Sequence, residues 1–243
     1  MLNRIRRWIC FSCPNYLLAK LNFESDDFWF EIINQYVKKE SVVLEIGSGS
    51  GIHPQNTLRP QCAHLTGVDF DKRVLRNSNL DKAYALEPSQ ELSDILGGKR
   101  FDVIYSHMVA EHIEDPKKFI ADQLALLTEG GVIIHSTVSS YSIVSILNRV
   151  LPARLKYFLI EKLGSGRTET DVFPAYYHLN SEAKLDILKQ EFGLNVFNIY
   201  YDTGSGYFAQ VPLLGLIYGV VQKVLCLGVE KMNGRLIFII WKA

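Results

Sequence analysis

The sequence predicts an α/β protein in which helices cover both faces of a mostly parallel sheet. Short continuous apolar runs, typical of strands buried on both faces, recur along the chain and alternate with segments of helical periodicity. The composition, 48% hydrophobic and 21% charged over 243 residues, is ordinary for a globular protein and suits one domain with insertions. The formal net charge of +0 gives no indication of a nucleic-acid partner.

Residues 1–40 are expected to form an N-terminal helical segment with a break near Cys13-Pro14. Within it, Ser25 and the two acids that follow fit the start of a helix. The apolar residues of this helix share one face at helical spacing: Phe28, Trp29, Ile32, Ile33 and Tyr36. Packing of this face against the sheet is the simpler interpretation, and a lid over a bound ligand is the alternative. The apolar stretch that ends at Phe11 is too short for a secretion signal.

A strand over Val42–Ile46, which contains the acid Glu45, runs directly into glycines at positions 47, 49 and 51. Glycines let the backbone turn sharply and approach a ligand, and a helix after them would direct N–H groups at an anionic part of that ligand. The dinucleotide fingerprint would need its third glycine at Ile52, and a P-loop would need a Lys-Ser/Thr pair. The motif therefore predicts another nucleotide-like cofactor, and a plain glycine-rich turn is the alternative.

A second strand, Leu65–Asp71, places the acid Asp69 22 residues beyond Gly47. This separation is close to the ~20 residues after which nucleotide-binding α/β folds present a ribose-binding carboxylate. The next residue, Phe70, offers a ring for an adenine face. A helix cap is the alternative role for Asp69, and Asp71 is equally suited to it.

Two further strands complete the pattern. Arg100–Met108 opens with Phe-Asp, and Leu126–Thr137 contains Gly-Gly near its start. Together with the glycine motif and Asp69, these segments resemble the class I S-adenosylmethionine-dependent methyltransferases over residues 41–137. The resemblance implies S-adenosylmethionine as the cofactor. It also implies a Rossmann-like, seven-stranded, mostly parallel sheet of order 3-2-1-4-5-7-6 with the last strand antiparallel.

The alternation of apolar runs and helical segments places the remaining strands, and the resemblance places the domain limits. The third strand is expected at Leu80–Leu86, and the last two at 196–200 and 235–241. The methyltransferase domain then spans 41–243, with insertions at about 138–180 and 203–234. Both insertions leave the carboxyl ends of strands, where open α/β sheets bind ligands, so we expect them to build the acceptor pocket.

The first insertion contains an F-P-x-Y-Y-H-x-N segment that is similar to an F-P-x-Y-Y-R-x-N pattern in bacterial methyltransferases, with His178 in place of the Arg. A histidine holds an anion only when it is protonated, so the acceptor preference differs. Tyr176, Tyr177 and His178 are the expected acceptor contacts, and a packed aromatic loop is the alternative. The second insertion holds 19 mostly apolar residues at 211–229 with Gln222-Lys223 near their middle. This favours a helix packed on the protein or lying in a membrane interface over a transmembrane span.

Proton removal from the acceptor is assigned to a histidine near the end of the fourth strand. His107 is expected to act as the base ahead of His112. The alternative is that Glu111 and His112 brace the following turn and that alignment of the reactants carries the reaction. The resemblance implies an acid near the end of the third strand that holds the adenine; Glu87 is the nearest match, and the alternative is that Ala85 occupies this position and backbone groups hold the adenine. The predicted cofactor-binding residues are Glu45, Gly47, Ser48, Gly49, Gly51, Asp69, Phe70, Glu87 and Ser106.

The predicted function is methyl transfer from S-adenosylmethionine to a small-molecule or lipid-linked acceptor, with oxygen, nitrogen and carbon acceptors all open. The alternatives are a NAD-dependent oxidoreductase and a catalytically silent interaction protein with the same fold. Scattered cysteines fit a reducing cytosol, and the lone Cys10-x-x-Cys13 pair predicts no metal site. We expect a cytoplasmic protein, with peripheral contact to the inner membrane face if the second insertion is interfacial. The sequence does not indicate an oligomeric state.

Overall fold

The computed structural model describes residues 25–51, 57–87, 90–152, 174–194, 197–202, 220–221, 224 and 234–242. Within these residues, seven strands form one sheet in the order β3-β2-β1-β4-β5-β7-β6. The strands are β1 Val42–Ile46, β2 His64–Asp69, β3 Lys82–Ala85, β4 Phe101–His107, β5 Leu127–Val138, β6 Phe197–Asp202 and β7 Arg235–Trp241. The predicted fold class and strand order are confirmed.

The direction of the strands defines one functional edge of the sheet. β1 pairs in parallel with β2 and β4, and β4 pairs in parallel with β5. β7 runs antiparallel to both β5 and β6. Because parallel strands end at the same edge, the glycine loop after β1, Asp69 at the end of β2 and His107 at the end of β4 lie along one edge.

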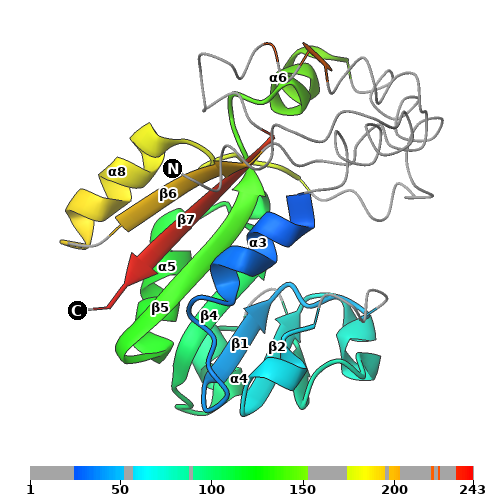
Figure 1. The fold of residues 1–243 in the computed structure, drawn as a ribbon, viewed down its shortest axis with the longest axis vertical. Helices are drawn as coiled ribbons and strands as arrows, with labels where there is room; N and C mark the ends of the chain where they lie inside the picture. The colour runs from blue at the N-terminus through cyan, green and yellow to red at the C-terminus, as the bar shows by residue number, and fades with distance from the viewer. Residues whose placement is uncertain are drawn as a thin grey trace, which may run out of the picture.

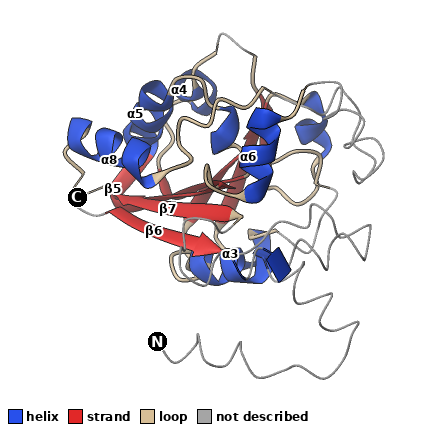
Figure 2. Ribbon diagram, turned by 90° about the horizontal axis from the view of Figure 1, so that it is seen from above, coloured by secondary structure: helices blue, strands red, loops and turns tan. Residues whose placement is uncertain are grey.

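Helices lie on both faces of the sheet (Figures 1 and 2). The α-helices are α3 Ser25–Ile33, α4 Leu92–Leu96, α5 Pro116–Leu126, α6 Ile143–Val150 and α8 Glu182–Glu191, and the 3-10 helices are η2 Arg59–Gln61, η3 Lys72–Arg76 and η4 Ala110–His112. In Figure 2, α4, α5 and α8 cover one face and α3 covers the other. Helix α6 stands at the end of the molecule toward which the parallel strands point (Figure 1).

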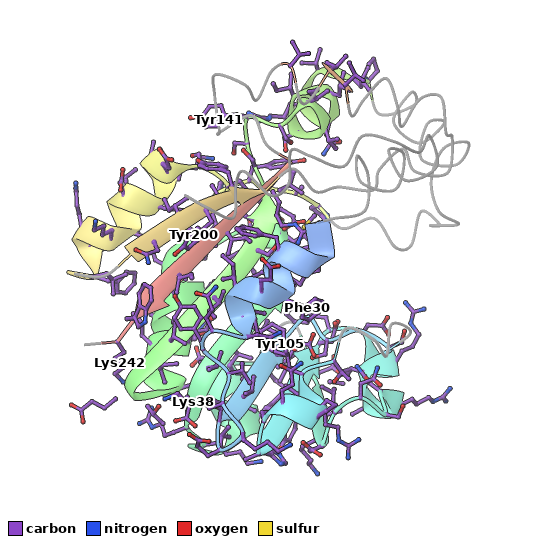
Figure 3. The ribbon with its side chains drawn as sticks, viewed as in Figure 1. Phe30, Lys38, Tyr105, Tyr141, Tyr200 and Lys242 are labelled. Atoms are coloured by element: carbon purple, nitrogen blue, oxygen red, sulfur yellow. The ribbon has the colours of Figure 1, made fainter. Side chains whose placement is uncertain are left out.

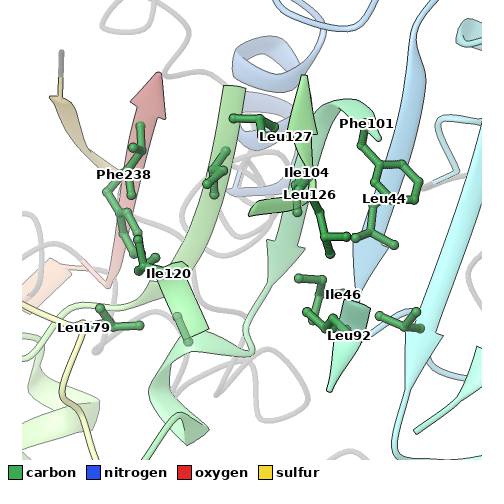
Figure 4. Close-up of a cluster of buried hydrophobic side chains, with 14 of the residues drawn as sticks. Leu44, Ile46, Leu92, Phe101, Ile104, Ile120, Leu126, Leu127, Leu179 and Phe238 are labelled. Carbon is green, nitrogen blue, oxygen red and sulfur yellow. The ribbon is translucent and has the colours of Figure 1, made fainter. Parts of the chain in front are cut away.

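Each face of the sheet carries its own apolar cluster. One joins the sheet to α4, α5 and α8 through residues such as Leu92, Ile120 and Leu188. Leu92 and Ile120 are labelled in Figure 4. The other holds Trp29 and Ile33 of α3, both almost fully buried. The helix in the N-terminal segment therefore packs against the sheet and shares its core.

The structure departs from the sequence prediction at the end of the first described helix. α3 ends at Ile33, so Tyr36 lies in the following turn, where its ring meets the edge of Trp241 at 5.6 Å. The helix expected directly after the glycine loop falls on a connection whose residues 52–56 lie outside those described, and the described part of this connection contains η2.

Some predictions concern residues outside those described. These are the helix break near Cys13-Pro14, the Cys10 and Cys13 pair, and all of segment 211–229 except 220–221 and 224. Among the described residues, no helix combines the length and the apolar character needed to cross a membrane. The same residues contain no group of three or more His, Cys, Asp or Glu side chains that would hold a metal ion.

Candidate active site

The glycine loop after β1 adopts the left-handed backbone that favours glycine: φ is +80° at Gly47, +55° at Gly49 and +73° at Gly51. A Cβ at Gly47 would collide with Val109, and a Cβ at Gly51 would collide with Asn77. A Cβ at Gly49 would meet no atom of the described residues within 4 Å. Gly47 and Gly51 therefore pack against the protein, whereas Gly49 faces open space where a ligand can approach the backbone.

Asp69 ties the end of β2 to this loop. Its Oδ2 accepts a hydrogen bond from the Gly49 N–H at 2.7 Å, and its Oδ1 accepts one from the Asp71 N–H at 2.8 Å. A carboxylate offers about four lone-pair sites, so each oxygen keeps the capacity to accept from a ligand hydroxyl. The next side chain, Phe70, is 59% exposed. The Asp69 carboxylate thus binds the N–H of Gly49, and the next side chain along the chain presents an exposed aromatic ring.

Two asparagines that the sequence analysis missed hold the carbonyls of the glycine loop. Asn77 Nδ2 donates to the carbonyls of Ser48 at 3.1 Å and Gly49 at 3.3 Å. Asn79 Nδ2 donates to the carbonyl of Gly51 at 2.9 Å. The loop is therefore held in its conformation by side chains nearly thirty positions away. In the sequence these residues appear only as an Asn-Ser-Asn segment at 77–79, which does not indicate that they hold the glycine loop.

Glu45 lies in β1 beside Tyr105 of β4, just before the glycine loop. Burial raises the pKa of the Glu45 carboxyl to about 7; hydrogen bonds from Tyr105 and Ser48 oppose this shift, and the negative charge of Asp69 adds to it. Burial, followed by the charge of Glu45, also raises the pKa of the Tyr105 hydroxyl well above its ordinary value. Glu45 is therefore a carboxyl that changes its charge near neutral pH next to the predicted cofactor loop.

Ser106 and Glu87 differ from the other predicted cofactor residues. Side chains alternate along a strand, so Ser106 faces away from Tyr105 and His107. Its fully buried Oγ lies 2.7 Å from Nδ1 of His135, whose pKa burial lowers to about 3, so the ring is neutral. The Ser106 hydroxyl is thus engaged inside the protein. Glu87 pairs at 3.0 Å with Lys72 Nζ on the surface.

His107, at the end of β4, is packed under the N-terminal helix. Its ring lies 5.4 Å from the ring of Trp29 in α3, and its Nδ1 atom is inaccessible to solvent. Tyr105, two residues earlier, lies 6.4 Å from the same Trp29 ring and is labelled beside α3 in Figure 3. Met108 then turns the chain toward η4 with φ of +57°, a conformation that non-glycine residues rarely adopt.

Glu111 in η4 joins three segments at the carboxyl edge of the sheet. Its Oε2 accepts a hydrogen bond from Thr137 Oγ1 of β5 at 2.8 Å. Its carbonyl accepts from the N–H groups of Tyr176 at 2.8 Å and Tyr177 at 3.2 Å. Asn180 Nδ2 also donates to Thr137 Oγ1, at 2.8 Å. Because Glu111 is only 5% exposed, these contacts give it a structural role that fastens the 174–180 loop to the sheet.

Two histidines form reciprocal links between η4 and the 174–178 loop. Nδ1 of His112 lies 2.7 Å from the carbonyl of Pro174, and Nδ1 of His178 lies 2.9 Å from the carbonyl of Glu114. A carbonyl only accepts, so Nδ1 carries the hydrogen in both rings, and the neutral ring has its lone pair on Nε2. The ring of Tyr176 lies 5.9 Å from that of His178. The structure thus brings His112, Tyr176 and His178 together.

Tyr177 is directed toward α6 instead. Its hydroxyl accepts a hydrogen bond from Asn148 Nδ2 at 2.5 Å, and the Arg149 guanidinium lies 5.5 Å from its ring centre. Its φ of +57° matches that of Met108. Among the described residues these two alone combine a side chain with positive φ, and both belong to this edge of the sheet.

The fold and this edge define an α/β protein built to present a glycine loop and a carboxylate to a nucleotide-like ligand. A family model described as "Methyltransferase domain" matches residues 23–196. The match covers more than half of the chain, and the chain belongs to this family. The resemblance to class I methyltransferases is confirmed, and the matched region includes α3.

Relatives of this chain differ in their named acceptors. It is 29% identical over 144 residues to a ubiquinone biosynthesis O-methyltransferase of Coxiella burnetii, covering 50% of this chain and 61% of the relative. It is 30% identical over 133 residues to a ribosomal protein L11 methyltransferase of Clostridium perfringens, covering 50% and 41%. The chain thus spans about half the length of these curated relatives. The structure of Haemonchus contortus phosphoethanolamine N-methyltransferase 2 with S-adenosylmethionine shares the fold, with a TM-score of 0.51, 15% identity and coverage of 93% and 56%.

Proposed function

We propose that this protein is an S-adenosylmethionine-dependent methyltransferase acting on a small-molecule acceptor. The observation that carries the proposal is Gly49, where a Cβ would meet no described atom within 4 Å and whose N–H is bound by the Asp69 carboxylate; the exposed Phe70 follows Asp69 in the chain. Family membership supports the same assignment. The O-methyltransferase, protein methyltransferase and N-methyltransferase named above differ in their acceptors, so they do not identify the acceptor atom of this protein.

The residues at the loop fit the parts of this cofactor. The Asp69 oxygens offer acceptors to a ribose, the Phe70 ring offers a face to an adenine, and the backbone at Gly49 permits close approach. Asn77 and Asn79 fix the loop carbonyls and so pre-organise this surface. Bound S-adenosylmethionine supplies a methyl group on a positively charged sulfur, which is electrophilic toward an aligned nucleophile. The protein then has to align the acceptor and exclude water.

His112 is our choice for the group that takes a proton from an oxygen or nitrogen acceptor. Its hydrogen bond to Pro174 orients the ring and selects the tautomer with a basic Nε2, as a general base requires. The sequence analysis ranked His107 first. Packing of His107 against Trp29, with Nδ1 shielded from solvent, supports a positioning role for it instead. Tyr176 and His178 beside His112 would contact the acceptor.

A pair of glycine variants tests the cofactor assignment. Gly49 and Gly97 have nearly the same φ, +55° and +59°, and a Cβ at either would meet no described atom within 4 Å. Gly97 caps α4 on a different part of the chain. Gly49→Val and Gly97→Val should therefore lose similar stability, at least about 1 kcal/mol each for a side chain in the left-handed region. Calorimetry with S-adenosylhomocysteine should show binding to wild type and Gly97→Val but not to Gly49→Val.

Equal affinity of the two variants would refute the site. Binding of NADH by the wild type without binding of S-adenosylhomocysteine would favour the oxidoreductase alternative. Cofactor binding without turnover of any methyl acceptor, across a panel of phenols, amines and activated carbon acids, would favour the silent interaction protein.

A further inference from the structure

Helix α6 turns its polar side toward the protein. Ser145 is fully buried, and its Oγ lies 3.0 Å from that of Ser142, the residue that caps the helix. Asn148 donates to the hydroxyl of Tyr177, and Arg149 donates to the carbonyl of Ser140 and stacks on the Tyr177 ring. The contacts that hold α6 in place are therefore mainly hydrogen bonds to its polar side.

The apolar side of α6 faces outward. Ile146, Leu147 and Val150 are 43%, 40% and 75% exposed, and Tyr141, just before the helix, is 44% exposed. Tyr141 is labelled beside α6 in Figure 3. A helix on the surface of a soluble protein normally has the opposite orientation, with its apolar stripe toward the core. An outward apolar stripe next to a ligand-binding edge indicates a surface that meets an apolar partner.

Exposed apolar side chains gather in the two insertions. Of the eleven large apolar side chains recorded as exposed in the described part of the chain, eight belong to residues 138–180 or 203–234. Three of these are Val220, Val221 and Val224, exposed by 50%, 43% and 61%. Figure 1 shows residues 220–221 at the same end of the molecule as α6. The exposure is thus a property of this end of the molecule.

The charges of the chain identify the kind of partner. Residues 138–180 contain five Lys or Arg against three Asp or Glu, and 203–234 contain two against one. Since the whole chain has a net charge of +0, the rest of the fold is acidic. A basic surplus in the segments that also expose apolar side chains is complementary to an anionic lipid surface. A second copy of the chain would instead bring like charges together.

We propose that α6 is a membrane-docking helix whose outward face, formed by Tyr141, Ile146, Leu147 and Val150, rests on an anionic bilayer. Its 8 residues extend ~12 Å, against a hydrocarbon core of ~30 Å, so it lies on the surface rather than crossing it. The Asn148–Tyr177 hydrogen bond links this helix directly to the predicted acceptor loop. Docking would bring the acceptor site to the lipid surface, and it does not depend on the proposed methyl transfer.

Vesicle flotation of the full chain tests this proposal. The probes are phosphatidylcholine vesicles with and without phosphatidylglycerol, and the variant is the double change Ile146→Glu with Leu147→Glu. The matched control is Ile187→Glu, which changes an isoleucine that is 61% exposed on α8. Wild type and Ile187→Glu should float with the anionic vesicles and be released by salt. The double variant should bind about tenfold less, because it loses two apolar contacts and adds two charges repelled by the lipid.

Four results would overturn the proposal. The first is that the wild type does not float with anionic vesicles, and the second is that the double variant floats as well as the wild type. The third is a wild-type dimer in light scattering that the double variant abolishes. The fourth is a melting temperature of the double variant far below that of Ile187→Glu. The third would assign the face to a second copy, and the fourth would show that it is packed within the protein. Calorimetry with S-adenosylhomocysteine on the same samples separates the two proposals, since flotation without cofactor binding refutes only the proposed function.

Discussion

Replacement of Glu45 by Gln should stabilise the protein above neutral pH. The pKa of this carboxyl rises from 4.5 to about 7 on folding, mainly because of burial. The folded state therefore holds the Glu45 proton more tightly than the unfolded state does. The contribution of this group to stability is fully present below pH 4.5 and is lost as the pH rises through 7. At about 1.4 kcal/mol per pKa unit, the loss amounts to up to about 3 kcal/mol above pH 7.

The glutamine side chain of the Glu45→Gln variant carries no charge at any of these pH values and has nearly the same size and shape as glutamate. We expect the free energy of unfolding of Glu45→Gln to exceed that of the wild type by up to about 3 kcal/mol at pH 8 and by less than about 1 kcal/mol at pH 5. Urea unfolding at pH 5, 6.5 and 8 measures this difference. Glu129→Gln, at an exposed position in β5, is the control and should follow the wild type throughout. Parallel pH profiles for wild type and Glu45→Gln, or a less stable variant at pH 8, would refute the reasoning.

Three further expectations follow from the site. Asp69→Ala should weaken S-adenosylhomocysteine binding by about 1.5–3 kcal/mol in calorimetry, the usual contribution of a hydrogen bond to a charged group; unchanged affinity would remove Asp69 from the site. His112→Ala should lower kcat by about 10²–10⁴-fold with cofactor affinity unchanged, whereas His107→Ala should mainly lower the melting temperature by losing its contact with Trp29; the reverse pattern would restore His107 as the base. Thr137→Val should lower the free energy of unfolding by about 1–3 kcal/mol in urea titrations, because it removes a buried donor to Glu111, and a neutral effect would contradict the role of that contact.

Features with strong local patterns were predictable from the sequence. The last strand was predicted at 235–241, and β7 spans Arg235–Trp241, because a continuous apolar run needs a buried position on both faces. The glycine motif was predicted to need backbone freedom, and all three glycines have positive φ. The strand order followed from the family resemblance and not from these local patterns.

Contacts between distant segments were not predictable from one sequence. The role of Asn77 depends on its meeting Ser48, 29 positions earlier, and that of Glu111 on its meeting Thr137, 26 positions later. Neither residue carries a local pattern that names its partner. Ser106 was predicted to contact the cofactor, and its pairing with His135, 29 positions later, has no local pattern in the sequence either. An apolar stripe that faces solvent has the same sequence periodicity as one that faces the core. Only the contacts of α6 in the structure show that its apolar stripe faces outward.

The register of the last strands has a consequence for how this fold can diversify. Arg235 of β7 pairs with Val138 of β5 on one side and with Asp202 of β6 on the other. The first insertion therefore begins at this point of the sheet, and the second insertion both begins and ends there. The first insertion also returns there, because Asn180 hydrogen-bonds to Val138 and Ser140. Both insertions are thus attached to the sheet at the same point, away from the glycine loop and Asp69. Under the two proposals above, exchanging these insertions would change the acceptor and the membrane contact while leaving the glycine loop and Asp69 unchanged.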